Sequence, residues 1–576
     1  MDRRRFLKSL VFGASMPLLQ ACSGLVPQAP TPAAGGTGPA QPTAAARPTA
    51  PQATAAAAAE VPKVAQTGRF MHAPEPNPKR GGTLHTAYGV TVSHYDFHQG
   101  GGGPLVMAFD NLVALDMSDG LSTIIPELAE SWDVSPDGRT YTFKVRDGVK
   151  FHDGTPFTAD DAVATFQRIV KPPANVASVY QQNLAVVDRV EPIDRLTMRF
   201  VLKHPWKPFL SALTGVNMVI YSKKTLEENN FDLRKVIAPG TGAFIYKEYK
   251  QAERWIFERN PNYWNPNLPY IDRIEMLHVP AWTDRGTAVL TGQADFSWNV
   301  SMDMYQEGLQ RQDMVNVRIL PHFGASYHFE MNNQRKPFDD PRVRRAIHLA
   351  VSRQNLIKAY AGQEYITMDR WVSHANTYAM PFEELDKLPG YRTDKKDDIA
   401  QAKQLLAEAG YSNGFDMELM SADVAPHAQI MSPAFQDELQ RTLNIRSTIK
   451  VLERSLLTDY LGKGEYDMQL STDYGSDTPD PELLWTNQLR TGASQNWSKY
   501  SNTKLDQTLD QLQIESDDAA RAKLFRQGMD ILDEEPAFYL VGFADHLPMW
   551  RKHVKGIVAG WKHTQWGRLH TVWLDA

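Results

Sequence analysis

The sequence predicts an α/β protein with several domains. Strand-like and helix-like patterns alternate along the chain from about residue 71 to the C-terminus, and this alternation is typical of α/β lobes. The composition is that of a globular protein, since 42% of the 576 residues are hydrophobic, 10% aromatic and 22% charged. A chain of this length suggests about three domains.

The first clear elements form a hairpin followed by a helix. Apolar and polar side chains alternate over Glu130–Val134 and Tyr141–Val145, on either side of the turn sequence Ser135–Gly138. Thr158 and Asp161 then have the spacing of a helix capping box. The apolar face of the predicted helix consists of Val163, Phe166, Ile169 and Val170. We therefore expect strands and helices to mix within one unit.

Two further helices are predicted in the second half of the chain. Asp340 and Pro341 supply a cap and a first-turn proline. The apolar residues that follow at helical spacing are Val343, Ala346, Ile347 and Ala350. The other helix is expected over residues 398–409, and Gly410 is placed to end it.

Residues 1–22 have the features of an export signal. An arginine run at residues 3–5 precedes the apolar stretch Ser9–Leu19, which is too short to span a bilayer, so the pattern is that of a twin-arginine signal. Leu19–Cys22 resembles a bacterial lipobox, which predicts that Cys22 becomes the lipidated first residue of the mature protein. The alternative is an ordinary signal peptide with a stray cysteine. Because Cys22 is the only cysteine, an internal disulfide is excluded.

Residues 23–74 are predicted to form a disordered tether. From Pro27 to Pro62 the chain is almost entirely Ala, Pro, Thr, Gln and Gly, and its only charges are Arg47 and Glu60. Such a segment cannot bury enough apolar area to offset its chain entropy. A tether behind a lipid anchor would hold a globular body off a membrane surface.

Charge and motifs argue against several classes of function. The net charge of -6 gives no basic footprint for nucleic acid, and no second apolar run approaches membrane-spanning length. The chain contains no phosphate-binding glycine pattern of an ATPase. None of its 16 histidines lies in an H-E-x-x-H pattern, so we predict neither a metal site nor a cofactor.

One motif is formally catalytic. Gly410–Gly414 matches the G-x-S-x-G pattern of serine hydrolases, with Ser412 as the candidate nucleophile. A nucleophile elbow needs a strand before the serine and a helix after it, whereas here a predicted helix comes first. The acid pairs at 339–340 and 397–398 lie at predicted helix starts, where capping accounts for them. We therefore predict that the chain is not an enzyme, with a surface-anchored hydrolase as the less favoured alternative.

A series of separated blocks carries a family resemblance. The blocks are Gly81–Leu84, Pro126–Trp132, Val149–Asp161, Gly240–Phe244, Arg259–Trp264, Thr291–Asp295, Pro337–Ala346, Tyr466–Asp467 and Asp477–Pro481. In this order they resemble family 5 of the extracellular solute-binding proteins of ABC importers, the peptide, dipeptide and nickel class. The resemblance covers essentially everything after the tether. Most blocks are turns, caps and packing residues, so they say little about the ligand.

The resemblance implies a two-lobed periplasmic-binding-protein fold (type II, cluster C) with an extra inserted domain, in which the ligand is enclosed when the lobes close. The first lobe is expected at 75–110, 203–322 and 546–576, the inserted domain at 111–202, and the second lobe at 323–545. The implied partners are a peptide or other small ligand and the transmembrane subunits of an ABC permease. A monomer is expected, lipid-anchored outside the cytoplasm.

The resemblance also implies the residues that line the ligand site. They are Gly101, Gly102, Gly103, Thr241, Tyr474, Gly475 and Asp477. In peptide-binding relatives the carboxylate matching Asp477 takes the amino terminus of the ligand, and the glycine-loop region presents backbone groups to an extended peptide. An enclosed ammonium needs such a carboxylate, and backbone pairing binds peptides without reading their side chains.

Two alternatives stay open for this site. The alternative role of Asp477 is that of a turn residue ahead of Thr478–Pro481. Tyr474 and Gly475 stand where many peptide binders have a tryptophan and a larger neighbour. An oligosaccharide or an opine-like polar solute is therefore the alternative to a peptide.

Overall fold

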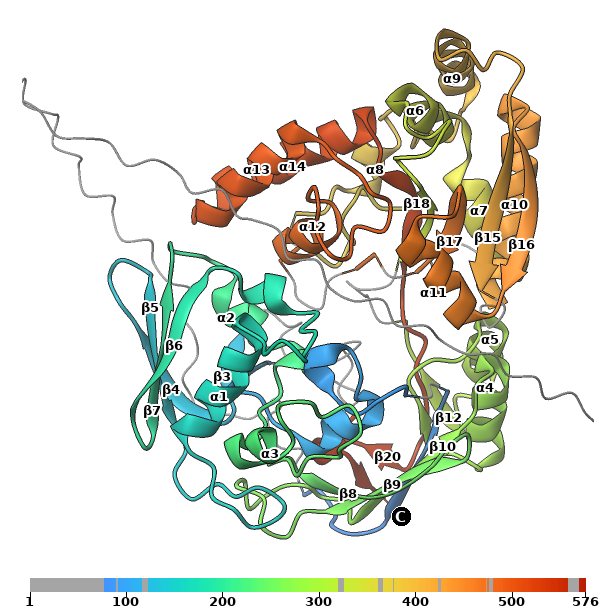
Figure 1. Cartoon of the computed structure of the whole chain (residues 1–576). Helices are drawn as coiled ribbons and strands as arrows, with labels where there is room; N and C mark the ends of the chain where they lie inside the picture. Colours follow the sequence, from blue (N-terminus) through green and yellow to red (C-terminus); the bar gives the residue numbers. More distant parts are fainter. Residues whose placement is uncertain are drawn as a thin grey trace, which may run out of the picture. The chain divides into compact units, whose positions relative to one another are not determined.

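The computed structural model describes residues 77–89, 92–116, 123–319, 326–360, 366–376, 378–422, 426–472, 474–475, 480–557 and 569–575. All of them belong to one structural unit, Ala58–Ala576. Within these ranges the strands form sheets of seven, six and four strands and two short two-stranded ribbons (Figure 1). The export signal, Cys22 and the whole of the tether predicted at 23–74 lie outside the described residues.

The seven-stranded sheet, which defines the first lobe, brings together segments from both ends of the chain. Its order is β12-β19-β11-β1-β10-β9-β8. The central strand β1 (Thr83–Tyr88) runs parallel to β10 (Arg273–His278) on one side and to β11 (Phe296–Ser297) on the other. The remaining strands are β8 (Phe244–Lys250), β9 (Arg254–Arg259), β12 (Val315–Val317) and β19 (Met549–Arg551). Helices α4 (Trp282–Thr291) and α5 (Met302–Gln310) pack beside it.

The four-stranded sheet defines the inserted domain. Its strands, all antiparallel in the order β4-β5-β7-β6, are β4 (Ala129–Val134), β5 (Thr140–Val145), β6 (Val187–Asp194) and β7 (Thr197–Leu202). The hairpin predicted from the sequence is confirmed in β4 and β5. Helix α1 (Ala159–Val170) packs on β6 and β7, with the Phe166 ring 4.9 Å from that of Phe200. Trp206 and the short helix α2 (Phe209–Ala212) join the same core.

The predicted capping box at the start of α1 is also confirmed. The Asp161 carboxylate accepts the backbone N–H of Thr158 at 2.8 Å, as the motif requires. Ser222 caps α3 (Lys223–Glu228) by the same local chemistry, because its hydroxyl accepts the N–H of Thr225.

The six-stranded sheet defines the second lobe, in the order β14-β18-β13-β17-β15-β16. Its strands are β13 (Ser326–Met331), β14 (Ile366–Thr367), β15 (Asp416–Ala422), β16 (Arg446–Leu452), β17 (Met468–Ser471) and β18 (Phe538–Ala544). Helices α6 (Pro341–Ala350), α7 (Arg353–Tyr360), α9 (Lys396–Glu408), α10 (Pro426–Leu443) and α11 (Arg454–Lys463) belong to this lobe. Further along the chain come α12 (Glu482–Gln488), α13 (Thr503–Ile514) and α14 (Asp518–Glu534). The stacked rings of Phe329 and Phe435, 3.7 Å apart, join the sheet to α10.

Both helices predicted in this lobe are present. Asp340 caps α6 by accepting the N–H of Arg342 at 2.9 Å. Helix α9 starts at Lys396, two residues before the expected start, and Gly410 follows its end with a φ of +88°. Ser412 of the G-x-S-x-G pattern lies in an exposed turn after this helix.

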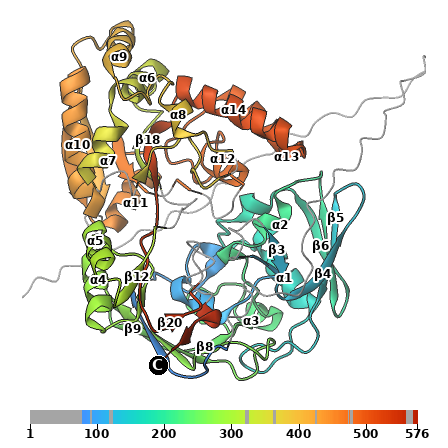
Figure 2. The ribbon, with the colours of Figure 1, turned by 180° about the vertical axis from the view of Figure 1, so that it is seen from behind.

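One connection between the two large sheets is well described. Residues 545–548 lead from β18 of the second lobe to β19 of the first, and Figure 2 shows this segment running between them. In the described ranges, no helix combines the length and apolar character needed to cross a membrane.

Candidate functional site

The glycine run identified in the sequence forms a tight loop. Gly101 and Gly102 join the 3₁₀ helices η1 (Phe97–Gln99) and η2 (Gly103–Ala108) of the first lobe. Gly102 has a φ of +97°, and a Cβ atom there would lie 2.5 Å from the ring of Phe97. A Cβ on Gly101 would meet the ring of His94 at 2.2 Å. The loop can therefore keep this path only with glycine at these two positions.

A buried ion pair holds the glycine loop in place. The side chains of Asp96 and Arg168 are fully buried and paired with each other. The Asp96 carboxylate also accepts the backbone N–H of His98 at 3.1 Å and the side-chain amide of Gln99 at 2.9 Å. Because Arg168 lies on α1, the pair connects the loop of the first lobe to the inserted domain.

The charges of this pair follow from its surroundings. Burial by itself raises the pKa of Asp96, but the guanidinium of Arg168 outweighs burial and holds that pKa below its usual value. Burial and the charge of Arg168 lower the pKa of His98 to about 3, so His98 is neutral. The buried pair therefore consists of the cation Arg168 on α1 and the anion Asp96 before the glycine loop, and the two charges compensate each other.

Thr241 lies in a segment packed against the end of η2. Thr241 is buried, and its hydroxyl donates to the Asp110 carboxylate at 3.0 Å. Added Cβ atoms on Gly240 and Gly242 would come within 1.9 and 2.5 Å of the Ala108 backbone. The segment 240–242 thus supports the helix that follows the glycine loop.

Tyr474 anchors the segment that carries Gly475. Its hydroxyl donates to the carbonyl oxygen of Trp371 at 2.6 Å, and its ring lies 4.9 Å from that of Phe538. Burial raises the pKa of Tyr474, so the hydroxyl keeps its proton. Asp477, the remaining predicted ligand contact, lies outside the described residues.

Gly475 lines a small cavity between the second lobe and the inserted domain. The cavity has a volume of about 70 Å³. Tyr180 and Asn183 line it from the inserted domain, and Leu483 and Asn487 from α12. Its wall is rich in side-chain amides, from Asn183, Asn217, Asn487, Gln488 and Gln495. The other predicted contacts that the structure describes, Gly101–Gly103, Thr241 and Tyr474, are not among its lining residues.

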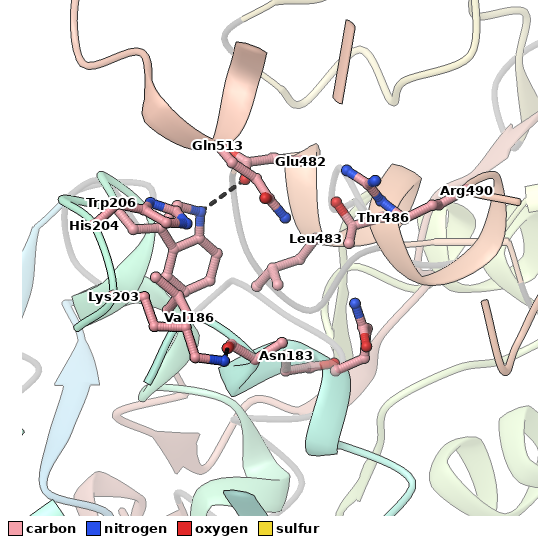
Figure 3. A pocket seen from close by; sticks show the side chains of 12 residues that line it. Asn183, Val186, Lys203, His204, Trp206, Glu482, Leu483, Thr486, Arg490 and Gln513 are labelled. Carbon is pink, nitrogen blue, oxygen red and sulfur yellow. Dashed lines mark hydrogen bonds between the residues drawn. The ribbon is translucent and has the colours of Figure 1, made fainter. Parts of the chain in front are cut away.

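A second, larger cavity adjoins the first and shares Asn183 and Leu483 with it. It measures about 290 Å³ and is drawn in Figure 3. Trp206 and Lys203 form its wall on the inserted-domain side. The opposite wall consists of Glu482, Leu483 and Thr486 from α12 and of Arg490, two residues beyond the end of that helix. The two cavities therefore follow the same helix.

Direct contacts join the inserted domain to the second lobe around these cavities. The Trp206 indole N–H donates to the Glu482 carboxylate at 2.7 Å (Figure 3). The side-chain amide N–H of Asn487 donates to the side-chain oxygen Oδ1 of Asn183 at 2.8 Å. Glu482 is buried, and Arg521 lies 3.0 Å from its other oxygen. Burial and the nearby charge of Asp480 raise the pKa of Glu482 to about 7.

In the part of the chain that the structure describes, no three His, Cys, Asp or Glu side chains come together in a group that could hold a metal ion.

Comparison with known proteins agrees with the two-lobed architecture described above. The model of the bacterial extracellular solute-binding proteins, family 5 Middle, matches residues 123–496, which is well over half of the chain. The chain belongs to the family 5 solute-binding proteins.

Relatives of this family 5 solute-binding protein include binders of small peptides. Glutathione-binding protein GsiB of Shigella flexneri serotype 5b (strain 8401) is 29% identical over 441 residues, covering 74% of this chain and 81% of GsiB. Di/tripeptide-binding protein 2 of Pseudomonas aeruginosa (strain UCBPP-PA14) is 28% identical over 465 residues, covering 76% of this chain and 84% of that protein.

The solved structures agree on the fold. The ABC transporter-associated periplasmic binding protein DppA from Helicobacter pylori, in complex with the peptide STSA, superposes with a TM-score of 0.74. Its sequence is 24% identical, and the match covers 86% of this chain and 99% of DppA. The predicted two-lobed, type II periplasmic-binding fold is thereby confirmed. This family binds solutes for ABC importers and is not enzymatic.

The contacts between the inserted domain and the second lobe have no counterpart in the sequence-based prediction. Trp206 and Glu482 are separated by 276 residues, and neither belongs to a recognisable motif. The resemblance identifies Gly475, which precedes α12, but the helix itself carries no family block. Only the folded arrangement reveals that α12 lines both cavities.

Proposed function

We propose that this protein is anchored outside the cytoplasm through Cys22 and captures a small peptide for delivery to the permease of an ABC importer. The observation that carries the proposal is the pair of adjoining cavities along α12, lined by the inserted domain on one side and by the second lobe, including Gly475, on the other. A solute held there touches both parts and favours the arrangement in which they meet.

The chemistry of the cavity walls suits a peptide. Side-chain amides donate and accept hydrogen bonds, as the peptide groups of a ligand require. The larger cavity, at about 290 Å³, lies just below the range of about 300 to 1,000 Å³ typical of small-ligand sites. A ligand of a few residues therefore fits better than a long oligopeptide. The relatives named for glutathione and for di- and tripeptides support the same size class.

The proposal assigns the amino terminus of the peptide to Asp477. A buried ammonium loses its hydration and needs a carboxylate within hydrogen-bonding distance. We expect Asp477→Asn to weaken the binding of glutathione and trialanine by about 2 to 5 kcal/mol in isothermal titration calorimetry. The matched control is Asp437→Asn, an exposed aspartate on α10. A loss of less than threefold would remove this role from Asp477.

The glycine loop and Thr241 are proposed to act on the ligand from the first lobe. Gly101–Gly103 would offer backbone groups to the peptide, and Thr241 would keep η2 in place behind them through its bond to Asp110. Calorimetry also decides the ligand class. Binding of an oligosaccharide or an opine, with no heat from any peptide, would replace the peptide assignment by the alternative solute.

The anchor is tested separately from the ligand. Cys22→Ala should abolish incorporation of labelled palmitate and move the protein from the membrane fraction to the soluble extracytoplasmic fraction. Retention of the label in this variant would contradict lipidation at Cys22.

A further inference from the structure

We propose that the larger cavity is a subsite for a carboxylate group of the solute, bound by Arg490 and Thr486. The inference rests on the proposed function and adds the chemical group that the solute must carry. It assigns the carboxyl end of a short peptide to the C-terminal end of α12, where Thr486 and Arg490 line the larger cavity.

The first observation is that donors in this cavity lack partners. Arg490 uses one nitrogen, Nη1, to contact Asp510 at 2.8 Å, but its Nε and Nη2 atoms are buried and make no hydrogen bond to any residue that the structure describes. The hydroxyl of Thr486, a residue only 4% exposed, is also buried and has no hydrogen-bond partner within the described ranges. Buried donors are nearly always paired in native proteins. Both residues line the cavity and are labelled in Figure 3.

The second observation is the geometry of the free donors. Nε–H and Nη2–H lie on the same edge of the guanidinium plane and point in parallel directions. This edge is the one that binds the two oxygens of a carboxylate in a fork. Asp510 occupies a different nitrogen and is mostly exposed, so it leaves the edge unused. The Arg490 side chain itself is only 21% exposed, so water screens its charge weakly.

The third observation is the balance of charge around the cavity. Its lining contains the cations Arg490 and Lys203 and one carboxylate, Glu482. Glu482 is already compensated, because it accepts the Trp206 indole N–H and lies 3.0 Å from Arg521, which is not a lining residue. Arg490 is paired with the mostly exposed Asp510, so Lys203 supplies the remaining positive charge beside the cavity, as an anionic group requires.

The spacing fits a short ligand. Helix α12 has seven residues and therefore spans roughly 10 Å at 1.5 Å per residue. An extended tripeptide covers about the same length at roughly 3.4 Å per residue. The shared residues Asn183 and Leu483 make the two cavities adjacent, so one ligand can occupy both.

The test compares trialanine with trialanine amide, which lacks the terminal charge, on the full-length protein by calorimetry. We expect the unchanged protein to bind trialanine more than about 30-fold more tightly than the amide. Arg490→Met should abolish this preference by weakening only trialanine, and Thr486→Val should weaken trialanine about fivefold. Arg526→Met, which removes an exposed arginine of α14, is the matched control and should keep the preference.

Two results would overturn the subsite. One is an Arg490→Met variant that keeps the preference for trialanine. The other is a variant that weakens both peptides equally, which would indicate a structural role. The thermal midpoint of each variant, measured alongside, shows whether it folds.

A second arm separates this inference from the peptide assignment. Should the unchanged protein bind neither peptide, the proposed function fails, and glutarate, a small dicarboxylate, then tests the subsite alone. A rise in thermal midpoint with glutarate that Arg490→Met removes would support the subsite. No rise would overturn it, and an equal rise with inorganic phosphate would overturn the assignment to a carboxylate.

Discussion

Replacing Asp96 by asparagine should destabilise the protein far more than the small change in shape suggests. Asp96 and Arg168 are both fully buried, and the carboxylate accepts hydrogen bonds from Arg168, His98, Gln99 and the backbone N–H of Leu233. The asparagine side chain keeps one acceptor oxygen and places an N–H₂ group where the other oxygen accepted bonds. It also leaves the Arg168 guanidinium buried without a counter-charge.

The magnitude follows from the burial of the pair. Removing one partner of a buried ion pair costs about 3 to 5 kcal/mol, because the remaining charge has lost both water and its partner. His98 cannot replace the lost negative charge, because an imidazole is either neutral or positively charged. We expect Asp96→Asn to lower the free energy of unfolding by about 4 kcal/mol.

Urea unfolding followed by tryptophan fluorescence measures this loss. Arg168→Met should be similarly destabilising, whereas the double variant Asp96→Asn/Arg168→Met should lose less than the two single losses added together, because no unpaired charge is left. A loss below about 1 kcal/mol for Asp96→Asn would refute the reasoning. Additive losses in the double variant would show that the two side chains do not act as a pair.

Two further predictions concern Trp206 and the half-buried His374. Trp206→Phe removes the indole N–H that donates to the Glu482 carboxylate at 2.7 Å. We therefore expect the Kd for trialanine, measured by calorimetry, to rise about tenfold. An unchanged Kd would show that this contact does not contribute to capture. Burial opposes a charge on His374, but hydrogen bonds to Asp369 and Asp545 outweigh burial and raise its pKa to about 10. The folded protein therefore keeps a proton on His374 that the unfolded chain gives up above pH about 6.5. The contribution of His374 to the free energy of unfolding is fully present below that pH. It falls, on the order of 2 kcal/mol in total, as the pH rises to 10. His374→Gln should flatten this part of the pH profile of the urea midpoint, and parallel profiles for the two proteins would contradict the assignment.

Local elements of the fold were predictable because their causes lie within a few residues. The turn at Ser135–Gly138, the capping box of Thr158 and Asp161 and the cap at Asp340 each depend on neighbours in sequence, and each is present. The pair at 397–398 shows where such reasoning stops. Asp398 does lie in the first turn of α9, but it is buried and accepts the backbone N–H of Gly390 at 2.8 Å.

The candidate site was predictable only as positions along the chain. The family resemblance identifies Thr241 and Tyr474, but it does not reveal that both hydroxyls are bonded inside the protein, to Asp110 and to Trp371. The roles of Trp206 and Arg490 could not be predicted, because each depends on segments brought together by folding. The domain limits and the assignment of Asp477 stay predictions.

The distance between the inserted domain and the second lobe tests the central claim most directly. Pulsed electron paramagnetic resonance measures this distance between two spin labels. The labels are attached at Ile193→Cys on β6 and Ile514→Cys at the end of α13, which are both exposed positions. Cys22→Ser removes the only other thiol. We predict that saturating trialanine or glutathione replaces a broad distance distribution by a single shorter one. A solute that binds and leaves the distribution unchanged would contradict capture between these two parts of the protein.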